Sequence, residues 1–375
     1  QPARTSSSAR LWIGLREGGY GVRPSPSYAG AVRSEAVGRR DERMAEPMAA
    51  AKRVIIDTDP GVDDALAILL AAAAPELRVE ALTVVAGNCP VEQGTTNALR
   101  VLELAGREDI PVAQGMAVPL VRSPRTAAEA HGETGLGDAH LPAPVCEPVA
   151  QHAVELLIER VTAAPGEITL VAIGPLTNLA MALRLEPDLA SAVREVIVMG
   201  GAIRAGGNVT PLAEFNIYSD PHAAHVVFHS DVPITLVPID VTDQVLLTEA
   251  DVERLSAVPS PISAFVRDVT RGYLRYLAQA RGLKGCALHD PLALALAFAP
   301  DLVELHSLYV DVGIGSGPCL GKTIADFYGL EGEKPNVRVA LGVRAREAAE
   351  VFVERVERLA RAETASSHKR PCSSR

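Results

Sequence analysis

One stretch decides the fold of this chain: Val54-Ile55-Ile56-Asp57-Thr58-Asp59-Pro60-Gly61-Val62-Asp63-Asp64-Ala65-Leu66-Ala67-Ile68. Its apolar, β-branched beginning predicts a buried strand. Pro60-Gly61 is a turn signal, and the Ala- and Leu-rich run 65–74 predicts a helix. A strand that turns directly into a helix is the building unit of an open α/β sheet.

The junction between that strand and helix is acidic, with Asp57, Asp59, Asp63 and Asp64 inside eight residues. Ligands of open α/β sheets bind at the carboxyl ends of the strands. Carboxylates this close repel one another unless a cation neutralises them, and oxygen ligands without His or Cys favour Ca²⁺ or Mg²⁺. A solvated helix N-terminus also explains Asp63 and Asp64. Asp57 and Asp59 flank a buried strand end, where unpaired charge is costly, so a metal or catalytic site is the favoured interpretation.

The composition bounds the class of protein. The 375 residues are 48% hydrophobic but only 4% aromatic, which predicts an aliphatic core. A formal net charge of −10 argues against a nucleic-acid-binding surface. The five cysteines are scattered without a C-x-x-C pair, which argues against zinc and disulfides and favours a reducing, cytoplasmic location. No apolar run approaches the roughly 20 residues of a spanning helix.

The two ends of the chain differ from its middle. Residues 1–50 are rich in Arg and Ser and show no sustained period, which predicts a disordered leader or a non-native extension. Such a leader is typical of an organellar transit peptide. The alternative is a native start at Met44 or Met48, which the lack of Met at position 1 favours. The polar segment 362–375 predicts a flexible tail.

Between them, residues 51–361 alternate strand and helix patterns without a linker, which predicts one domain. The predicted fold is α/β, with a mostly parallel, Rossmann-like open sheet and helices on both faces. A late β-hairpin is expected from 308–314 and 322–327. The Pro- and Gly-rich segment 121–148 predicts a long functional loop. The other expected strands are 79–85, 110–113, 168–173, 196–199 and 234–237, and the other expected helices are 93–105, 150–163, a helix ending at 185, 221–230, 262–281, 290–298 and 347–360.

Three motifs lie where strands are expected to end. Asp57 to Asp64 match D-x-D-P-G-x-D-D, Gly207 to Asn216 match G-N-x-T/S-x-x-A-E-F-N, and His289-Asp290-Pro291 begins a helix. In these motifs and from about residue 53 to 359 the chain resembles the nucleoside hydrolase family. The resemblance implies Ca²⁺-dependent hydrolysis of the N-glycosidic bond of ribonucleosides to ribose and free base, by a homodimer or homotetramer.

The resemblance also implies roles for individual residues. Asp59 is expected to activate water and His289 to assist the departing base. Calcium is expected on Asp59, Asp64, Asp290 and the backbone carbonyl of Ile173, where the family's threonine is replaced without loss of the main-chain oxygen. Amides and carboxylates suit sugar hydroxyls, because they donate and accept hydrogen bonds. The expected substrate-binding residues are Asp63, Asn88, His131, Asn208, Glu214 and Asn216.

Other interpretations of these patterns are weaker. A Mg²⁺-dependent phosphohydrolase with Asp57 or Asp59 as nucleophile requires a basic phosphate clamp, and only Lys52 and Arg53 lie near the motif. A non-catalytic nucleoside or sugar binder does not need Asp59 and His289 beside a full set of metal ligands. The glycines of 315–323 do not have P-loop spacing, and a strand is expected to follow them. The helix 273–281 is expected to flank the base, and it does not specify purine or pyrimidine.

Overall fold

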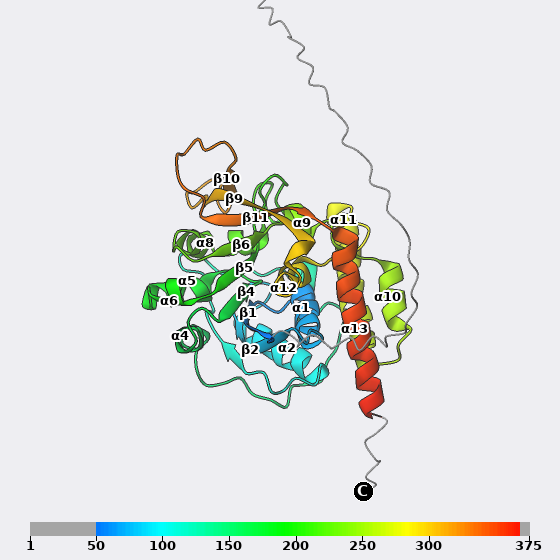
Figure 1. Cartoon of the computed structure of the whole chain (residues 1–375). Helices are drawn as coiled ribbons and strands as arrows, with labels where there is room; N and C mark the ends of the chain where they lie inside the picture. The colour runs from blue at the N-terminus through cyan, green and yellow to red at the C-terminus, as the bar shows by residue number, and fades with distance from the viewer. Residues whose placement is uncertain (1–49, 368–375) are drawn as a thin grey trace, which may run out of the picture. The chain divides into compact units, whose positions relative to one another are not determined.

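Residues 50–367 are described in this structure, which is a computed structural model. Within that range nine strands form one sheet in the order β10-β9-β11-β6-β5-β4-β1-β2-β3 (Figure 1). The seven strands from β11 to β3 are parallel, and β9 is antiparallel to both of its neighbours. The strands are β1 Lys52–Thr58, β2 Leu77–Val84, β3 Val112–Gln114, β4 Ile168–Ala172, β5 Glu195–Met199, β6 Ile234–Val237, β9 Val303–Val312, β10 Thr323–Asp326 and β11 Val337–Val343. The predicted α/β class and the late β9–β10 hairpin are confirmed.

Strand β1 lies inside the sheet and is covered on both faces. Val54, Ile55 and Ile56 are fully buried. Val54 and Ile56 belong to one apolar core, and Ile55 belongs to the other. A parallel sheet covered on both faces requires such a continuous apolar run, because successive side chains point to opposite faces.

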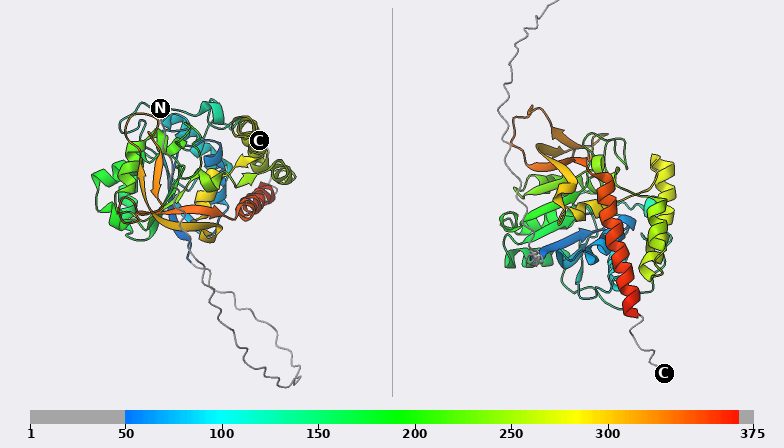
Figure 2. Two further views of the ribbon diagram at one scale, coloured as in Figure 1. Left: turned by 90° about the horizontal axis from the view of Figure 1, so that it is seen from above. Right: turned by 45° about the vertical axis from the view of Figure 1, so that its right-hand side comes forward.

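Helices supply the two cores. One face carries α1 Val62–Ala72, α2 Val91–Leu104, α11 Pro261–Arg281, α12 His289–Ala295 and α13 Ala345–Ser367. The opposite face carries α4 Ala153–Ala163, α5 Thr177–Leu185, α6 Leu189–Ala192 and α8 Pro221–Phe228 (Figures 1 and 2). The remaining elements are α3 Ala128–His131, α7 Phe215–Ser219, α9 Ile239–Thr242, α10 Glu249–Ser256, η1 Pro300–Leu302 and the small ladder of β7 Leu246–Leu247 with β8 Cys286–Ala287.

Several boundaries differ from the prediction. Strand β11 was not predicted, and it lies between β9 and β6. Helix α1 begins at Val62 rather than Ala65, because its first N–H groups have acceptors: Gly61 N–H donates to Asp64 (2.9 Å) and Val62 N–H to His131 (3.0 Å). Helix α13 continues to Ser367, past the expected start of the tail. The predicted leader and the end of the tail lie outside the described residues.

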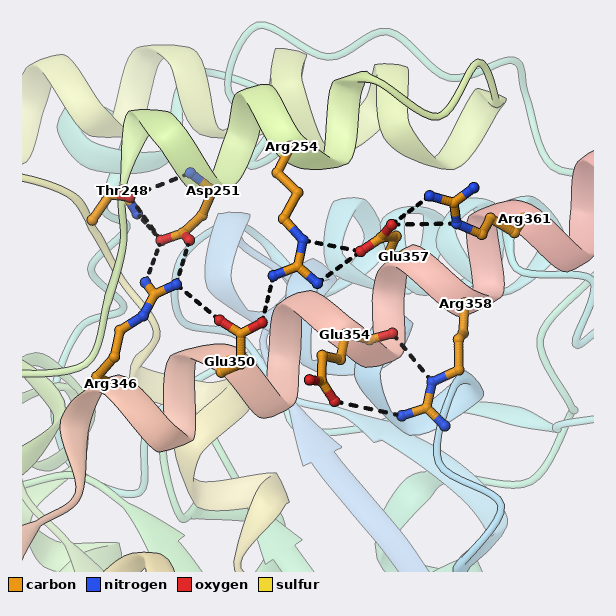
Figure 3. Close-up of polar contacts among 9 residues, drawn as sticks. All are labelled: Thr248, Asp251, Arg254, Arg346, Glu350, Glu354, Glu357, Arg358 and Arg361. Atoms are coloured by element: carbon orange, nitrogen blue, oxygen red, sulfur yellow. Dashed lines mark hydrogen bonds and ion pairs between the residues drawn. The ribbon is translucent and has the colours of Figure 1, made fainter.

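Helix α13 is fixed to α10 by a network of ion pairs (Figure 3). Arg254 of α10 pairs with Glu350 and with Glu357 (2.8 Å). From α13, Arg346 donates two hydrogen bonds of 2.9 Å to the buried Asp251. Of the helices in 50–367, none has both the length and the apolar character needed to cross a membrane.

Candidate active site

The carboxylates of the opening motif are all buried where β1 turns into α1. Asp64 is held by the loop that surrounds it. Its Oδ1 accepts hydrogen bonds from the Thr58 hydroxyl (2.5 Å) and the Asp59 N–H (3.2 Å). Its Oδ2 accepts from the Gly61 N–H (2.9 Å) and the Asn88 side chain (3.0 Å). These bonds fix the turn and offset part of the cost of burying the charge.

Asp59 is fully buried, and only one of its two carboxylate oxygens has a hydrogen-bond partner. Its Oδ2 accepts a hydrogen bond from the Asn88 N–H (2.7 Å), while its Oδ1 has no hydrogen-bond partner. Two glycines make room for it: a Cβ on Gly87 would lie 2.0 Å from Oδ2, and a Cβ on Gly174 would lie 2.6 Å from Oδ1. Burial, helped by the charges of Asp64 and Asp63, raises the pKa of Asp59 well above its ordinary value. A partnerless buried carboxylate oxygen is a site for a cation or a proton.

Asp63, Asp64 and Asp290 form a compact oxygen cluster, in which one ligand atom from each lies within 4.8 Å of the others. Asp63 Oδ1 is another buried oxygen without a partner. Burial, and then the charges of Asp63 and Asp64, raise the pKa of Asp290 well above normal. The donor set therefore fits a hard divalent cation. Asp64 and Asp290 meet as expected. Asp63, expected on the sugar, joins them, and Asp59 is not a member of this cluster.

The backbone carbonyl of Ile173 follows β4, as expected. It accepts a hydrogen bond from the Asn216 side-chain amide (2.9 Å), which also donates to the Met199 carbonyl (3.2 Å). Asn216 therefore joins the ends of β4 and β5, and a sequence-predicted sugar ligand is directly linked to a sequence-predicted metal ligand.

The loop before α7 is held by its own polar side chains. Glu214 caps α7: its Oε1 accepts from the Asn216 N–H (2.8 Å), and its Oε2 accepts from the Gly201 (2.8 Å) and Ile217 (3.1 Å) N–H groups. Asn208 accepts from the Phe215 N–H (2.9 Å). Burial raises the pKa of Glu214. In this structure the hydrogen bonds of Glu214 and Asn208 therefore hold the backbone of the loop in place.

Both predicted histidines are buried and neutral at pH 7. His131 Nδ1 accepts the Val62 N–H (3.0 Å), which leaves the ring proton on Nε2, and the ring stacks on Tyr273 with centroids 5.2 Å apart. His289 Nδ1 lies 2.7 Å from the Thr242 hydroxyl. Burial lowers the pKa of His131 to about 4 and that of His289 to about 3. Each is a neutral hydrogen-bonding group rather than a cation.

A cavity of about 210 Å³ brings most of the predicted residues together. Its walls include nine of them: Asp63, Asn88, His131, Ile173, Asn208, Glu214, Asn216, His289 and Asp290. Asp59 and Asp64 do not line it and lie beneath it, against Asn88. The prediction named no contact for the other side chains of the wall, notably Arg125, Met199, Phe215, Tyr273, Tyr276 and Arg281. Of these, Tyr273, Tyr276 and Arg281 belong to the helix 273–281 that was expected to flank the base, without individual contacts being predicted.

Asp57 stands apart from this site. Its Oδ1 accepts hydrogen bonds from the Thr83 hydroxyl (2.6 Å) and the Asn178 amide (2.8 Å), and burial raises its pKa to about 7. Neither of these two partners lines the cavity, whereas Asp59 is bonded to Asn88 of the cavity wall, and this disfavours Asp57 as a nucleophile. Lys52 and Arg53 lie at the opposite end of β1 and supply no phosphate clamp.

The glycine-rich segment before β10 is no phosphate loop either. A strand follows it, and the Lys322 ammonium donates to the backbone carbonyls of Ala202 (2.6 Å) and Ile203 (3.1 Å). The lysine therefore holds the turn after β5.

Comparisons with known proteins give a consistent result. The family described as inosine-uridine preferring nucleoside hydrolase matches residues 54–350. A pyrimidine-specific ribonucleoside hydrolase RihA of Shewanella sp. (strain MR-4) is 42% identical over 291 residues, which cover 77% of this chain and 91% of the relative. A purine-preferring ribonucleoside hydrolase from Gardnerella vaginalis superposes with a TM-score of 0.79 at 34% identity, covering 83% of this chain and 100% of that one. A plant nucleoside hydrolase superposes with a TM-score of 0.79 at 39% identity, covering 82% and 99%.

Proposed function

Because the chain belongs to the inosine-uridine preferring nucleoside hydrolase family, we propose that it is a Ca²⁺-dependent enzyme that hydrolyses ribonucleosides to ribose and free base. It is a hydrolase of N-glycosyl compounds, like its named relatives. The observation that carries the mechanism is Asp59 Oδ1, a fully buried carboxylate oxygen without a partner beneath a polar cavity.

Calcium is the proposed metal because the resemblance to the family implies it, and the carboxylate cluster offers only oxygen side-chain donors, which suit a hard divalent cation. Asp64 and Asp290 would hold it, together with Asp59 and the Ile173 carbonyl as the sequence motifs imply, and Asp63 is close enough to contribute. When bound, such an ion lowers the pKa of a water molecule and orients it.

Asp59 is the proposed general base. Cleavage of a glycosidic bond passes through an oxocarbenium-like state, which water attacks at the anomeric carbon. Oδ2 of Asp59 is occupied by the Asn88 N–H, so Oδ1 is the oxygen that accepts the water's proton. Gly87 and Gly174 leave room for the carboxylate at that position.

His289 assists the departing base as a hydrogen-bond donor. Its low pKa makes it neutral at pH 7, and Thr242 fixes the orientation of its ring. His131, stacked on Tyr273, presents Nε2–H from another part of the cavity wall. In a buried site of low dielectric, a hydrogen bond from such a neutral donor is stronger than in water.

The ribose is proposed to bind between Asp63, Asn88, Asn208, Glu214 and Asn216, which line the cavity. The partnerless Oδ1 of Asp63 suits a sugar hydroxyl as acceptor. The names of the relatives divide between pyrimidine-specific and purine-preferring enzymes, so the proposed substrate class is ribonucleosides in general.

Product analysis with inosine, uridine and p-nitrophenyl riboside tests the function. Release of ribose with the free base, or with p-nitrophenol from the nitrophenyl riboside, is expected, and it should be lost on chelation and restored by calcium. Tight nucleoside binding without ribose release would contradict it and favour the non-catalytic binder.

The proposal includes the oligomeric state and the cellular location of the enzyme. A homodimer or homotetramer is expected, which light scattering measures. A cytoplasmic location is supported by the free thiols of the described cysteines Cys89, Cys146, Cys286 and Cys319.

A further inference from the structure

A second group of metal-ligating side chains lies away from the active-site cavity. His225 and His229 are four residues apart at the end of α8, and Asp311 reaches them from the adjacent strand β9 (Figure 1). One donor atom from each lies within 4.8 Å of the others. None of the three lines the active-site cavity. We propose that they form a binding site for a divalent transition ion, with Zn²⁺ as its probe.

His229 is already in the tautomer that such an ion needs. Its Nδ1 lies 2.8 Å from the backbone carbonyl of His225. A carbonyl only accepts, so Nδ1 carries a proton, and in the neutral ring Nε2 carries the lone pair. Nε2 points toward Asp311, 3.8 Å from its Oδ1. Metal-bound histidines usually donate their other ring N–H to a carbonyl or carboxylate in this way.

Asp311 is oriented by the backbone. Its Oδ1 accepts a hydrogen bond from the Val312 N–H (2.7 Å) and lies 3.0 Å from His225 Nδ1. His225 donates a proton to that carboxylate oxygen when the carboxylate is ionised. A divalent ion would take the place of this proton: the neutral His225 ring changes tautomer, Nδ1 giving its proton to water while Nε2 takes one up from water. The ring stays neutral, and its Nδ1 and Asp311 become ligands.

The donor set selects the class of ion. Two imidazoles and one carboxylate suit zinc, cobalt or nickel, whereas calcium prefers an all-oxygen set. Tyr309, whose hydroxyl lies 3.4 Å from His229 Nε2, is the next oxygen at hand. The side chains are 37%, 32% and 40% exposed, so an ion and its remaining water ligands can reach them.

The consequence is a cross-link between α8 and β9. Helix α8 follows directly on α7, which carries Asn216, and Asp220 caps α8 at that junction. An ion here ties the end of this segment to the antiparallel edge of the sheet. Its role is therefore stabilising, and separate from the proposed calcium chemistry.

Zinc binding by the full chain in excess calcium tests the proposal. The excess calcium is added to fill the buried oxygen cluster where calcium is proposed to bind, and a competing chromophoric chelator reports zinc affinity. One zinc ion per chain is expected in addition to calcium, with a rise in the melting temperature. His229→Ala and Asp311→Asn should each weaken zinc binding by more than about tenfold, the loss that even an outer-shell change can cause.

A matched control lies on the same strand. His306 lies 3.0 Å from Glu304 and belongs to neither group of three metal-ligating side chains found among the described residues. His306→Ala should therefore leave zinc affinity unchanged. Cobalt in place of zinc should give visible bands that His225→Ala/His229→Ala removes. The proposal is overturned if the wild type binds no ion beyond calcium, or if His229→Ala and Asp311→Asn bind zinc as tightly as the wild type. Asp311→Asn, which keeps the shape of the side chain, still locates the ion if His229→Ala fails to fold.

Discussion

Oδ1 of Asp59 lies 2.6 Å from the position that a Cβ would take on Gly174. The backbone of Gly174 is not in the left-handed region, so the glycine is required by this close approach and not by its φ angle. Gly174, which follows Ile173, thus allows the backbone after β4 to approach the proposed base Asp59 closely. The position of the carboxylate that follows β1 therefore depends on a residue without a side chain in the turn after the neighbouring strand β4.

Gly174→Ala should lower kcat/KM by an order of magnitude or more, because displacement by about 1 Å costs on the order of 10² in rate. The calcium content and the fold should persist. Gly315→Ala is the matched control, since a Cβ there meets no atom within 4 Å and φ is not positive. Steady-state kinetics of both variants on one ribonucleoside make the comparison. Equal activities would mean that Asp59 tolerates displacement and is not the base.

Undialysed protein should contain about one calcium ion per chain, measured by elemental analysis. Chelation should lower the melting temperature, because the buried Asp63, Asp64 and Asp290 then repel one another, and a ligand that binds only the folded state stabilises it. Calcium should restore both stability and activity. Zinc in place of calcium, rather than in addition to it, would contradict the assignment.

His131 should make the stability of the protein depend on pH. Burial lowers its folded pKa from 6.5 to about 4, so between these values the unfolded chain binds the extra proton. Its contribution to stability is complete above pH 6.5 and is lost as the pH falls toward 4. His131→Leu should flatten the dependence of melting temperature on pH in that window. His140→Leu, on the exposed part of the same loop, should not change it. An unaltered slope in His131→Leu would refute the shift.

Much of the fold followed from local sequence signals. The apolar runs around Ile55, Leu170 and Val198 each mark a buried parallel strand, because such strands need apolar side chains on both faces. Strand β11 was not predicted because Arg338 and Gly342 interrupt its short apolar run. Its place beside β6 also depends on pairing between segments far apart in the sequence.

The site was only partly predictable, for a similar reason. Motifs identify residue types, and from them Asp64, His289 and Asp290 were expected in one site. Motifs do not show where backbone N–H groups point. Such groups donate hydrogen bonds to Glu214, which therefore caps a helix. Motifs also do not show contacts between distant segments, such as Tyr273 on His131.

Arg346→Ala should destabilise the protein at neutral pH, because the buried Asp251 then keeps only Thr248 as a hydrogen-bonding partner (Figure 3). The loss should be about 1 kcal/mol, since Arg346 itself is largely exposed. Burial alone would raise the pKa of Asp251, but hydrogen bonds from Arg346 and Thr248 outweigh it and lower the pKa to about 2. The stabilisation is complete above the unfolded pKa of about 4 and is lost as pH falls toward 2.

Calorimetry across that range should therefore show the wild type and Arg346→Ala converging in acid. Arg344→Ala is the control, because it removes only an exposed pair with Glu347 at 3.5 Å. A constant difference down to pH 2 would show that the Asp251 pair is not its source.

Asp59→Asn and Asn216→Ala should separate catalysis from binding. In Asp59→Asn, the Asn88 N–H selects the amide oxygen at the Oδ2 position. The amide NH₂ then occupies the place of Oδ1, and it cannot accept a proton. Turnover should fall by about 10² to 10⁴, the usual contribution of a general base. Binding of a ribose-like inhibitor should persist, because the hydroxyl-binding side chains are unchanged.

Asn216→Ala removes the amide that bonds the carbonyls of Ile173 (2.9 Å) and Met199 (3.2 Å) and that is proposed to hold the sugar. KM should rise, and turnover should fall as well if its hydrogen bonds to the sugar strengthen in the transition state. Titration calorimetry with the inhibitor distinguishes the two variants: Asp59→Asn should bind it far more tightly than Asn216→Ala. If Asp59→Asn kept near-wild-type turnover with calcium bound, its role as base would be wrong. Asp63 and Asp57 each have a partnerless buried oxygen, but Asp63 also belongs to the carboxylate cluster with Asp64 and Asp290, so Asp63 would be the next base to test.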